Sequence, residues 1–129
     1  MKSVVLCSSR RFATEAKAFM AELEKAGAKT FIPPLQTWTM EEWGKLSKRE
    51  KQTAINKLTL DHFDKIDAAD VVFLYNPGGY AGVSVSLELG YAHAKSKPIY
   101  ALENDPEYAR NSLFKEYTST PNDLIKYLT

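Results

Sequence analysis

The sequence predicts an α/β fold, a three-layer sandwich in which a parallel sheet of four to five strands lies between two layers of helices. Short apolar runs rich in β-branched residues alternate along the chain with longer segments of helical periodicity. This alternation is typical of strand–helix–strand units and parallel sheets. The run VVFLYN (71–76) also lacks polar alternation, as expected of a strand covered on both faces.

The first 33 residues predict a strand, a helix and a second strand. KSVVLC (2–7) is a short apolar run that indicates a buried strand. Apolar residues then recur at helical spacing, namely Phe12, Ala16, Phe19, Met20 and Leu23. Gly27 follows as a helix stop, and KTFIP (29–33) predicts a strand that ends at Pro33 and Pro34.

The next segment predicts one long helix after an irregular stretch. Trp38, Met40 and Trp43 lie in a loop or a short helix. A longer helix is expected from about Ser47 to Ala68, since an apolar face runs along it. That face consists of Ile55, Leu58, Thr59, His62, Phe63 and Ile66.

The remainder of the chain continues the alternation. After the strand at 71–76 and a glycine-rich loop, a helix is expected over 84–95 and a strand at PIYAL (98–102). A connector leads to a short fifth strand around KEYTS (115–119). Thr120-Pro121 then opens a final helix, with proline at its favoured first position. The predicted architecture is Rossmann-like, of the flavodoxin-like kind.

Length, composition and charge narrow the class of protein. A chain of 129 residues indicates a single domain over 1–129. A formal net charge of +1 gives no indication of binding to nucleic acid or to an anionic membrane. No apolar run approaches the ~20 residues of a membrane helix. The single cysteine, Cys7, excludes an internal disulfide and fits a reducing compartment. We therefore expect a soluble, cytoplasmic protein.

Glu88 is the first candidate catalytic residue. In parallel α/β folds the ligand lies beyond the carboxyl ends of the strands, where the loop NPGGYAGVS follows the third strand. Its glycines allow close approach of a ligand, and Ser84 is the expected helix N-cap. Glu88 then falls about one turn into the helix, where a negative charge is favoured and a carboxylate suits a nucleophile. The alternative is a first-turn acid on a solvated face.

The helical phase favours the functional interpretation of Glu88. Val85, Leu89 and Ala92 mark the buried stripe of the helix. Glu88 and Tyr91 border that stripe at the end facing the ligand crevice.

These residues resemble a known family. The segments ELGYA (88–92), SKPI (96–99) and CSSRRF (7–12) are similar to motifs of the nucleoside 2-deoxyribosyltransferase-like family, which includes the 2′-deoxynucleoside 5′-monophosphate N-glycosidases. The resemblance covers most of the chain apart from about 34–55. It implies that Glu88 attacks the anomeric carbon and forms a covalent glycosyl-enzyme, as in a retaining glycosidase. Water completes a hydrolase, and a second base completes a transferase.

The second acidic residue of the family is replaced here. It lies eight positions before the aspartate that opens the third strand, and in this chain that position is His62, with Asp61 and Asp64 beside it. His62 could orient the sugar or base or donate a proton. Two alternatives stay open, a packed core histidine and a role for Asp61 or Asp64.

The resemblance also implies a substrate-binding set. The transferases carry an aspartate six positions before the nucleophile, where this chain has Gly82. A serine near that place contacts phosphate in the monophosphate glycosidases, and Arg11 matches an arginine of their first loop; solvated arginines are the alternative. These differences favour 5′-phosphate recognition over base exchange. The implied substrate-binding residues are Cys7, Ser8, Ser9, Arg11, Phe12, Gly79, Gly82, Ser84, Ser86, Tyr91, Asn111 and Ser112.

The family resemblance implies a homodimer in which Asn111 and Ser112 reach the neighbouring active site. Phe12, Trp38 and Trp43 could stack a base, although lone aromatic residues more often serve packing. With two histidines and one cysteine, we expect no metal site of standard spacing and no cofactor.

Three other functions compete with this interpretation. A catalytically silent nucleotide-binding sensor on the same fold is compatible with the missing second carboxylate. The loop NPGGYAG is similar to the PGGxGT loop of the Lonely-guy phosphoribohydrolases, but it lacks the GT. A flavodoxin-like redox module would need a flavin loop that we do not find.

Overall fold

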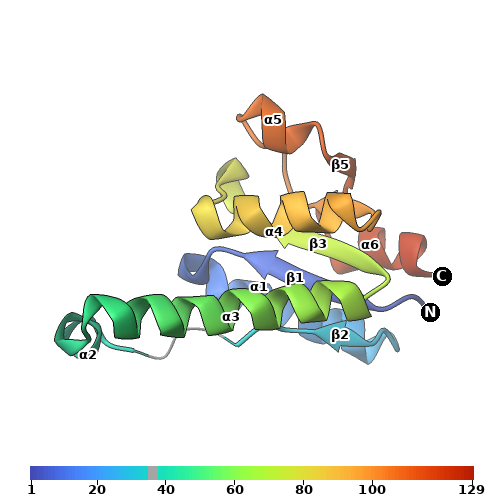
Figure 1. Cartoon of the computed structure of the whole chain (residues 1–129). Coiled ribbons are helices and arrows are strands. Elements are labelled where there is room, and N and C mark those ends of the chain that lie inside the picture. Colours follow the sequence, from blue (N-terminus) through green and yellow to red (C-terminus); the bar gives the residue numbers. More distant parts are fainter. Residues whose placement is uncertain (35–37) are drawn as a thin grey trace.

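The protein forms a five-stranded, all-parallel sheet with helices on both faces, as the sequence predicts (Figure 1). The computed structural model describes residues 1–34 and 38–129. The strands are β1 (Val4–Ser8), β2 (Thr30–Phe31), β3 (Val71–Tyr75), β4 (Ile99–Ala101) and β5 (Phe114–Tyr117). Their order in the sheet is β2-β1-β3-β4-β5, the flavodoxin-like order, in which the chain reverses direction across the sheet between β1 and β3.

The helices are α1 (Ala13–Lys25), α2 (Met40–Lys45), α3 (Lys48–Ala68), α4 (Val83–Ala94), α5 (Tyr108–Asn111) and α6 (Pro121–Leu128). Short 3₁₀ turns at Arg10–Phe12 and Pro77–Gly79 follow β1 and β3. The helix at α5 falls within the predicted connector. Among the described residues, no helix is both long enough and apolar enough to cross a membrane.

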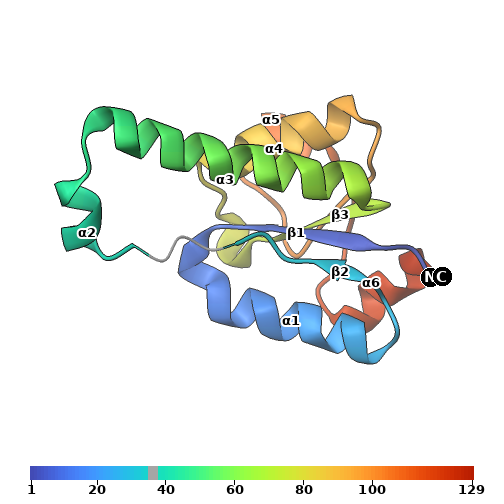
Figure 2. The same ribbon diagram turned by 60° about the horizontal axis from the view of Figure 1, so that its bottom comes forward.

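The two faces of the sheet carry separate cores. Figure 2 shows α1 and α6 on one face and α3 and α4 on the other. Alternate residues of β1 point to opposite faces, so Val4 and Leu6 pack with α1 and α6, and Val5 and Cys7 pack beneath α3 and α4. This geometry places the side chain of Cys7 under the two helices that carry the candidate catalytic residues.

Helix α3 extends beyond the sheet. Its C-terminal end lies against α4 and the sheet and buries His62 and Ile66, whereas its N-terminal half projects with α2 past the carboxyl ends of the strands (Figures 1 and 2). Ser47 caps the helix, and Ser47 and Glu50 form a reciprocal capping box, so the predicted start at Ser47 is confirmed to within one residue.

The glycine loop after β3 is fixed against the loop after β4. Buried Asn76 donates to the carbonyl of Glu103 and accepts from its N–H. Gly79 has a φ of +77°, and a Cβ there would lie 2.4 Å from the carbonyl oxygen of Asn104. Because Gly79 has no side chain, the backbone of the glycine loop can contact the backbone of the loop after β4.

The start of α4 differs from the prediction. Its N-cap is Gly82, not Ser84, and no side chain in the described part of the chain caps it. Glu88 consequently lies in the second turn, one turn beyond the N–H groups that lack helical partners. The stabilisation of negative charge by a helix N-terminus therefore applies to the first turn of α4 and not to Glu88.

Candidate active site

A cavity of about 370 Å³ lies at the carboxyl ends of β1 and β3, where a parallel α/β sheet ordinarily binds its ligand. The loop after β1, the start of α4 and the apolar stripe of α3 form its walls. Its lining residues are Ser8, Ser9, Arg10, Pro33, Pro34, Ile55, Leu58, Thr59, His62, Gly82, Val83, Ser84, Val85 and Glu88.

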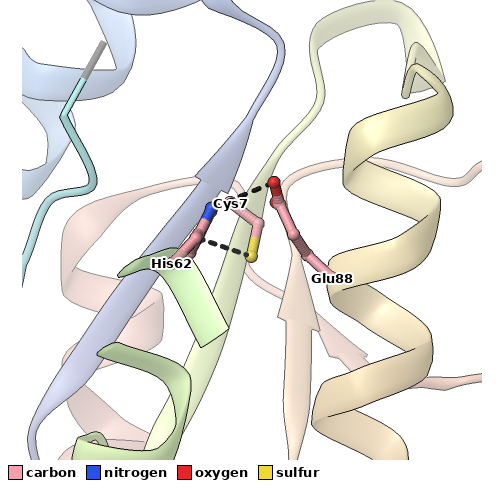
Figure 3. Close-up of side chains that lie close together, drawn as sticks. All are labelled: Cys7, His62 and Glu88. Carbon is pink, nitrogen blue, oxygen red and sulfur yellow. Dashed lines mark hydrogen bonds and ion pairs between the residues drawn. The ribbon is translucent and has the colours of Figure 1, made fainter. Parts of the chain in front are cut away.

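Glu88 and His62 meet at the wall of this cavity. Figure 3 shows the two side chains pointing toward each other from α4 and α3, and the distance between His62 Nδ1 and Glu88 Oε1 is 2.9 Å. Both residues are buried, with 9% of Glu88 and 6% of His62 exposed. The other carboxylate oxygen of Glu88, Oε2, has no hydrogen-bond partner within residues 1–34 and 38–129.

The hydrogen bonds of His62 determine where its protons lie. Nε2 lies 3.0 Å from the backbone carbonyl oxygen of Leu6, and a carbonyl can only accept, so the network assigns a proton to Nε2. The contact between Nδ1 and Glu88 then requires a further proton, either on Nδ1 of an imidazolium or on Glu88. The pair therefore shares one proton, and Oε2 is a buried oxygen that makes no hydrogen bond within the described residues.

Cys7 lies beneath this pair. Its Sγ is 3.5 Å from His62 Nε2, and the residue is completely buried. Burial raises the pKa of the Cys7 thiol well above its ordinary value, and the nearby Glu88 charge raises it further. Cys7 is therefore a neutral thiol at neutral pH and not a nucleophile.

The loop after β1 presents Arg10 to the cavity. Ser8 and Ser9 also line it, and the Ser8 hydroxyl is anchored by donation to the carbonyl of Tyr75. The guanidinium of Arg11 instead stacks on the ring of Tyr80, 3.7 Å from the ring centroid. Phe12 lies edge-on to that ring and to Tyr75, away from the lining set.

Several predicted site residues lie outside the cavity wall. Tyr91 donates to Asp67 and stacks on Phe63 of α3. The Ser86 hydroxyl donates to the carbonyl of Gly82 and accepts from Arg110. Tyr91 therefore links α4 to α3, and Ser86 links α4 to Arg110 of α5.

The other candidate acids and the α5 residues also lie elsewhere. Asp61 pairs with Lys65 and lines a separate open groove, and Asp64 is exposed. Asn111 accepts from the N–H of Asp105 and from the hydroxyl of Tyr117, and Ser112 donates to the carbonyl of Ala109.

The separate groove is larger than the cavity, at about 750 Å³. Trp38 lines it and packs on Trp43, with 5.2 Å between ring centroids. We place the candidate site in the smaller cavity, because convergent buried polar groups mark a site better than volume does.

Sequence reasoning missed part of the lining. Ile55, Leu58 and Thr59 were expected on the core face of α3, and they line the cavity instead. Their signal was present in the sequence, because they share the helical stripe of His62. Arg10 lies beside Arg11 in the same loop, so the sequence placed it near the site but indicated its neighbour.

Comparisons with known proteins agree with this geometry. The sequence model of the nucleoside 2-deoxyribosyltransferase family matches residues 4–124. No curated protein matches the chain.

Solved structures share the fold at low identity. A conserved protein from Enterococcus faecalis is 14% identical with a TM-score of 0.62, and the match covers 99% of this chain and 97% of that one. A CMP N-glycosidase from Clostridium botulinum is 15% identical (TM-score 0.54; 98% of both chains). A 2-deoxyribosyltransferase from Bacillus psychrosaccharolyticus is 18% identical (TM-score 0.59; 95% and 89%). With the family match spanning nearly the whole sequence, the chain belongs to the nucleoside 2-deoxyribosyltransferase family.

Proposed function

We propose that this protein cleaves the N-glycosidic bond of a (2′-deoxy)nucleoside 5′-monophosphate through a covalent intermediate on Glu88. One observation carries the proposal: a buried carboxylate at the cavity wall has one oxygen held by His62 and the other without a hydrogen-bond partner among the described residues. An ionised carboxylate held in this way suits a sugar carbon that develops positive charge.

The proposed reaction places the sugar carbon against the Glu88 carboxylate. One carboxylate oxygen attacks C1′ as the bond between C1′ and the base nitrogen breaks, and the departing base keeps the electron pair of that bond. His62 holds Oε1, so the carboxylate does not rotate away from the reacting carbon. Attack of water on C1′ then releases the sugar and restores the carboxylate, and the proton that water loses balances the one taken up by the departed base. A second base in place of water would give base exchange.

The lining supports a monophosphate as substrate. Among the described lining residues, Glu88 is the one acid and Arg10 the one arginine or lysine. Arg10, the Ser8–Ser9 loop and the free N–H groups at the start of α4 form a donor-rich end of the cavity that suits a phosphate. Pro33, Ile55 and Leu58 provide an apolar wall that suits a base.

The first experiment is a substrate panel. The protein is incubated with common deoxynucleosides, ribonucleosides and their 5′-monophosphates, with and without a competing free base, and released or exchanged base is separated by chromatography. Release from monophosphates alone supports the proposal. Exchange on nucleosides favours a transferase, and ligand binding without turnover supports the silent sensor. Mass spectrometry of acid-quenched enzyme then tests for a sugar on the peptide containing Glu88.

Arg10 and Arg11 provide a matched pair for the phosphate. We expect Arg10→Ala to raise KM for a monophosphate by about tenfold more than Arg11→Ala does, since a hydrogen bond to a charged group contributes roughly 1.5–3 kcal/mol. The corresponding nucleoside is the control substrate, for which the two variants should differ little. A larger effect of Arg11→Ala would indicate that Arg11, the arginine implied by the family resemblance, binds the phosphate.

The proposal includes a cytoplasmic, single-domain homodimer in which Asn111 and Ser112 complete the neighbouring site. Its support is that the two residues line no part of the cavity of their own chain. A mixture of Glu88→Gln and Asn111→Ala chains tests it: shared sites recover part of the activity on mixing, and independent sites recover none.

A further inference from the structure

Cys7, His62 and Glu88 form a compact cluster at the base of the cavity. One potential ligand atom from each residue lies within 4.8 Å of the other two, and all three side chains are buried (Figure 3). They come from three elements, β1, α3 and α4, so the fold and not a local sequence motif brings them together. The sequence expectation of no metal site depended on local spacing and could not detect this cluster.

The donor set suits Zn²⁺. Thiolate, imidazole and carboxylate are the three side-chain types that bind this ion, and sites with three protein ligands leave a fourth position open. The 3.5 Å between Cys7 Sγ and His62 Nε2 also fits. A tetrahedral ion at ordinary Zn–S and Zn–N distances separates its sulfur and nitrogen ligands by about 3.5 Å.

Glu88 provides a second, independent indication of a ligand. Its Oε2 is buried and has no partner in the part of the chain that the structure describes. A buried acceptor without a partner costs free energy, which a bound cation would recover. The fourth position of such an ion would face the cavity, because His62 and Glu88 both line it.

We propose that Cys7, His62 and Glu88 bind Zn²⁺ and that the ion inhibits base release by occupying the Glu88 carboxylate. Binding through His62 Nε2 removes the thiol proton of Cys7 and the Nε2 proton, leaves one proton on Nδ1, and transfers no electrons; the Glu88 carboxylate turns from Nδ1 toward the ion. His62 Nε2 must also give up its hydrogen bond to Leu6. The inhibition rests on the proposed function, whereas the binding of the ion does not.

Spectroscopy with Co²⁺ tests the site without any assay of activity. Titration of the reduced protein with Co²⁺ should give a near-ultraviolet sulfur-to-metal charge-transfer band, which Zn²⁺ then removes. Cys7→Ser should abolish the band, and Glu88→Gln should weaken Co²⁺ binding by at least about 100-fold, the upper end of the loss for an outer-sphere partner. His93→Asn, which changes the exposed second histidine on α4, is the matched control. Absence of the band, or an equal band in Cys7→Ser, would overturn the site.

Inhibition is measured separately on the substrate that the panel identifies. Each enzyme is compared with its own chelator-treated form, and Zn²⁺ should inhibit the wild type at a concentration at least about tenfold lower than Cys7→Ser. Equal inhibition of both enzymes would overturn the regulatory role. If the panel finds no base release, the Co²⁺ titration still decides the site, so failure of the function and failure of the metal site are distinguishable.

Discussion

The two halves of α3 have the same helical periodicity and different surroundings. In the C-terminal half, Ile66 is fully buried against the sheet and His62 meets α4, whereas Ile55 in the N-terminal half is 40% exposed. The apolar stripe continues past the edge of the sheet, where Ile55, Leu58 and Thr59 line the cavity. A helix that is longer than its sheet thus contributes buried core residues with one end and lines the candidate cavity with the other.

This comparison predicts different roles for the two ends of α3. The buried end should contribute both to stability and to the proposed catalysis, and the projecting end should contribute little to the free energy of global unfolding. Substitutions along α3 and its partner α4 can therefore test which role each position has.

The largest expected effect is on Glu88. Glu88→Gln should lower turnover by at least about 10⁴-fold, equivalent to about 5.5 kcal/mol, because an amide cannot act as the nucleophile. The fold should survive, since the glutamine amide can donate to an unprotonated His62 Nδ1. Base release by chromatography and a thermal melt measure the two quantities. Persistent base release from a pure variant would remove Glu88 as the nucleophile.

The stability contrast between the halves comes next. Ile66→Ala should destabilise the protein by about 3 kcal/mol, as expected for loss of a fully buried side chain with a cavity left behind. Ile55→Ala is the matched control and should cost less than about 1 kcal/mol, because its side chain is partly in solvent. Denaturant unfolding measures both values. Equal losses would mean that the projecting half is held as firmly as the buried half.

A smaller effect on activity is expected from His62. His62→Asn should lower turnover by about 10²-fold, equivalent to about 2.7 kcal/mol, since the shorter side chain cannot bridge Leu6 and Glu88. It should also lower stability, because both oxygens of a buried carboxylate then lack partners among residues 1–34 and 38–129. His93→Asn controls for loss of a histidine. Activity of His62→Asn equal to wild type would leave His62 as a packing residue.

The elements of this fold were largely predictable from sequence. Buried parallel strands read as continuous apolar runs, and the prediction at 71–76 matches β3 to within one residue. The Ser47 cap and the final Thr120-Pro121 start were also predictable, because capping is a local interaction. Cys7, His62 and Glu88 could be chosen individually, but their mutual contacts depend on tertiary packing.

Details of the loops were not predictable. Successive residues of a 3₁₀ turn point about 120° apart, so Arg10 and Arg11 face different directions, and the partner of Arg11 is Tyr80, far along the chain. Ser84 has the composition of an N-cap, yet the helix starts two residues earlier than that cap requires, with Gly82 at the N-cap.

The smallest expected effect tests the free end of α3. Ser47→Ala removes a cap that contributes about 1 kcal/mol, but we expect the loss mainly in local opening and not in global unfolding, because the projecting half has few buried contacts. Amide hydrogen exchange over the first turns of α3 should accelerate about fivefold, with residues near Ile66 unchanged. A matching loss in global unfolding would show that the whole helix is one cooperative unit.

Glu50, in the first turn of α3, should make the stability of the helix start depend on pH in a predictable direction. Bonds from the backbone and side chain of Ser47 lower the pKa of Glu50 below its ordinary 4.5. Its support for the helix start is therefore present above pH 4.5 and is lost as the pH falls through the lowered folded-state pKa. Wild-type exchange in the first turns should accelerate on acidification relative to Glu50→Gln, which keeps an acceptor for Ser47 but does not titrate. Parallel pH dependence in the two proteins would show that the capping box is not held in solution.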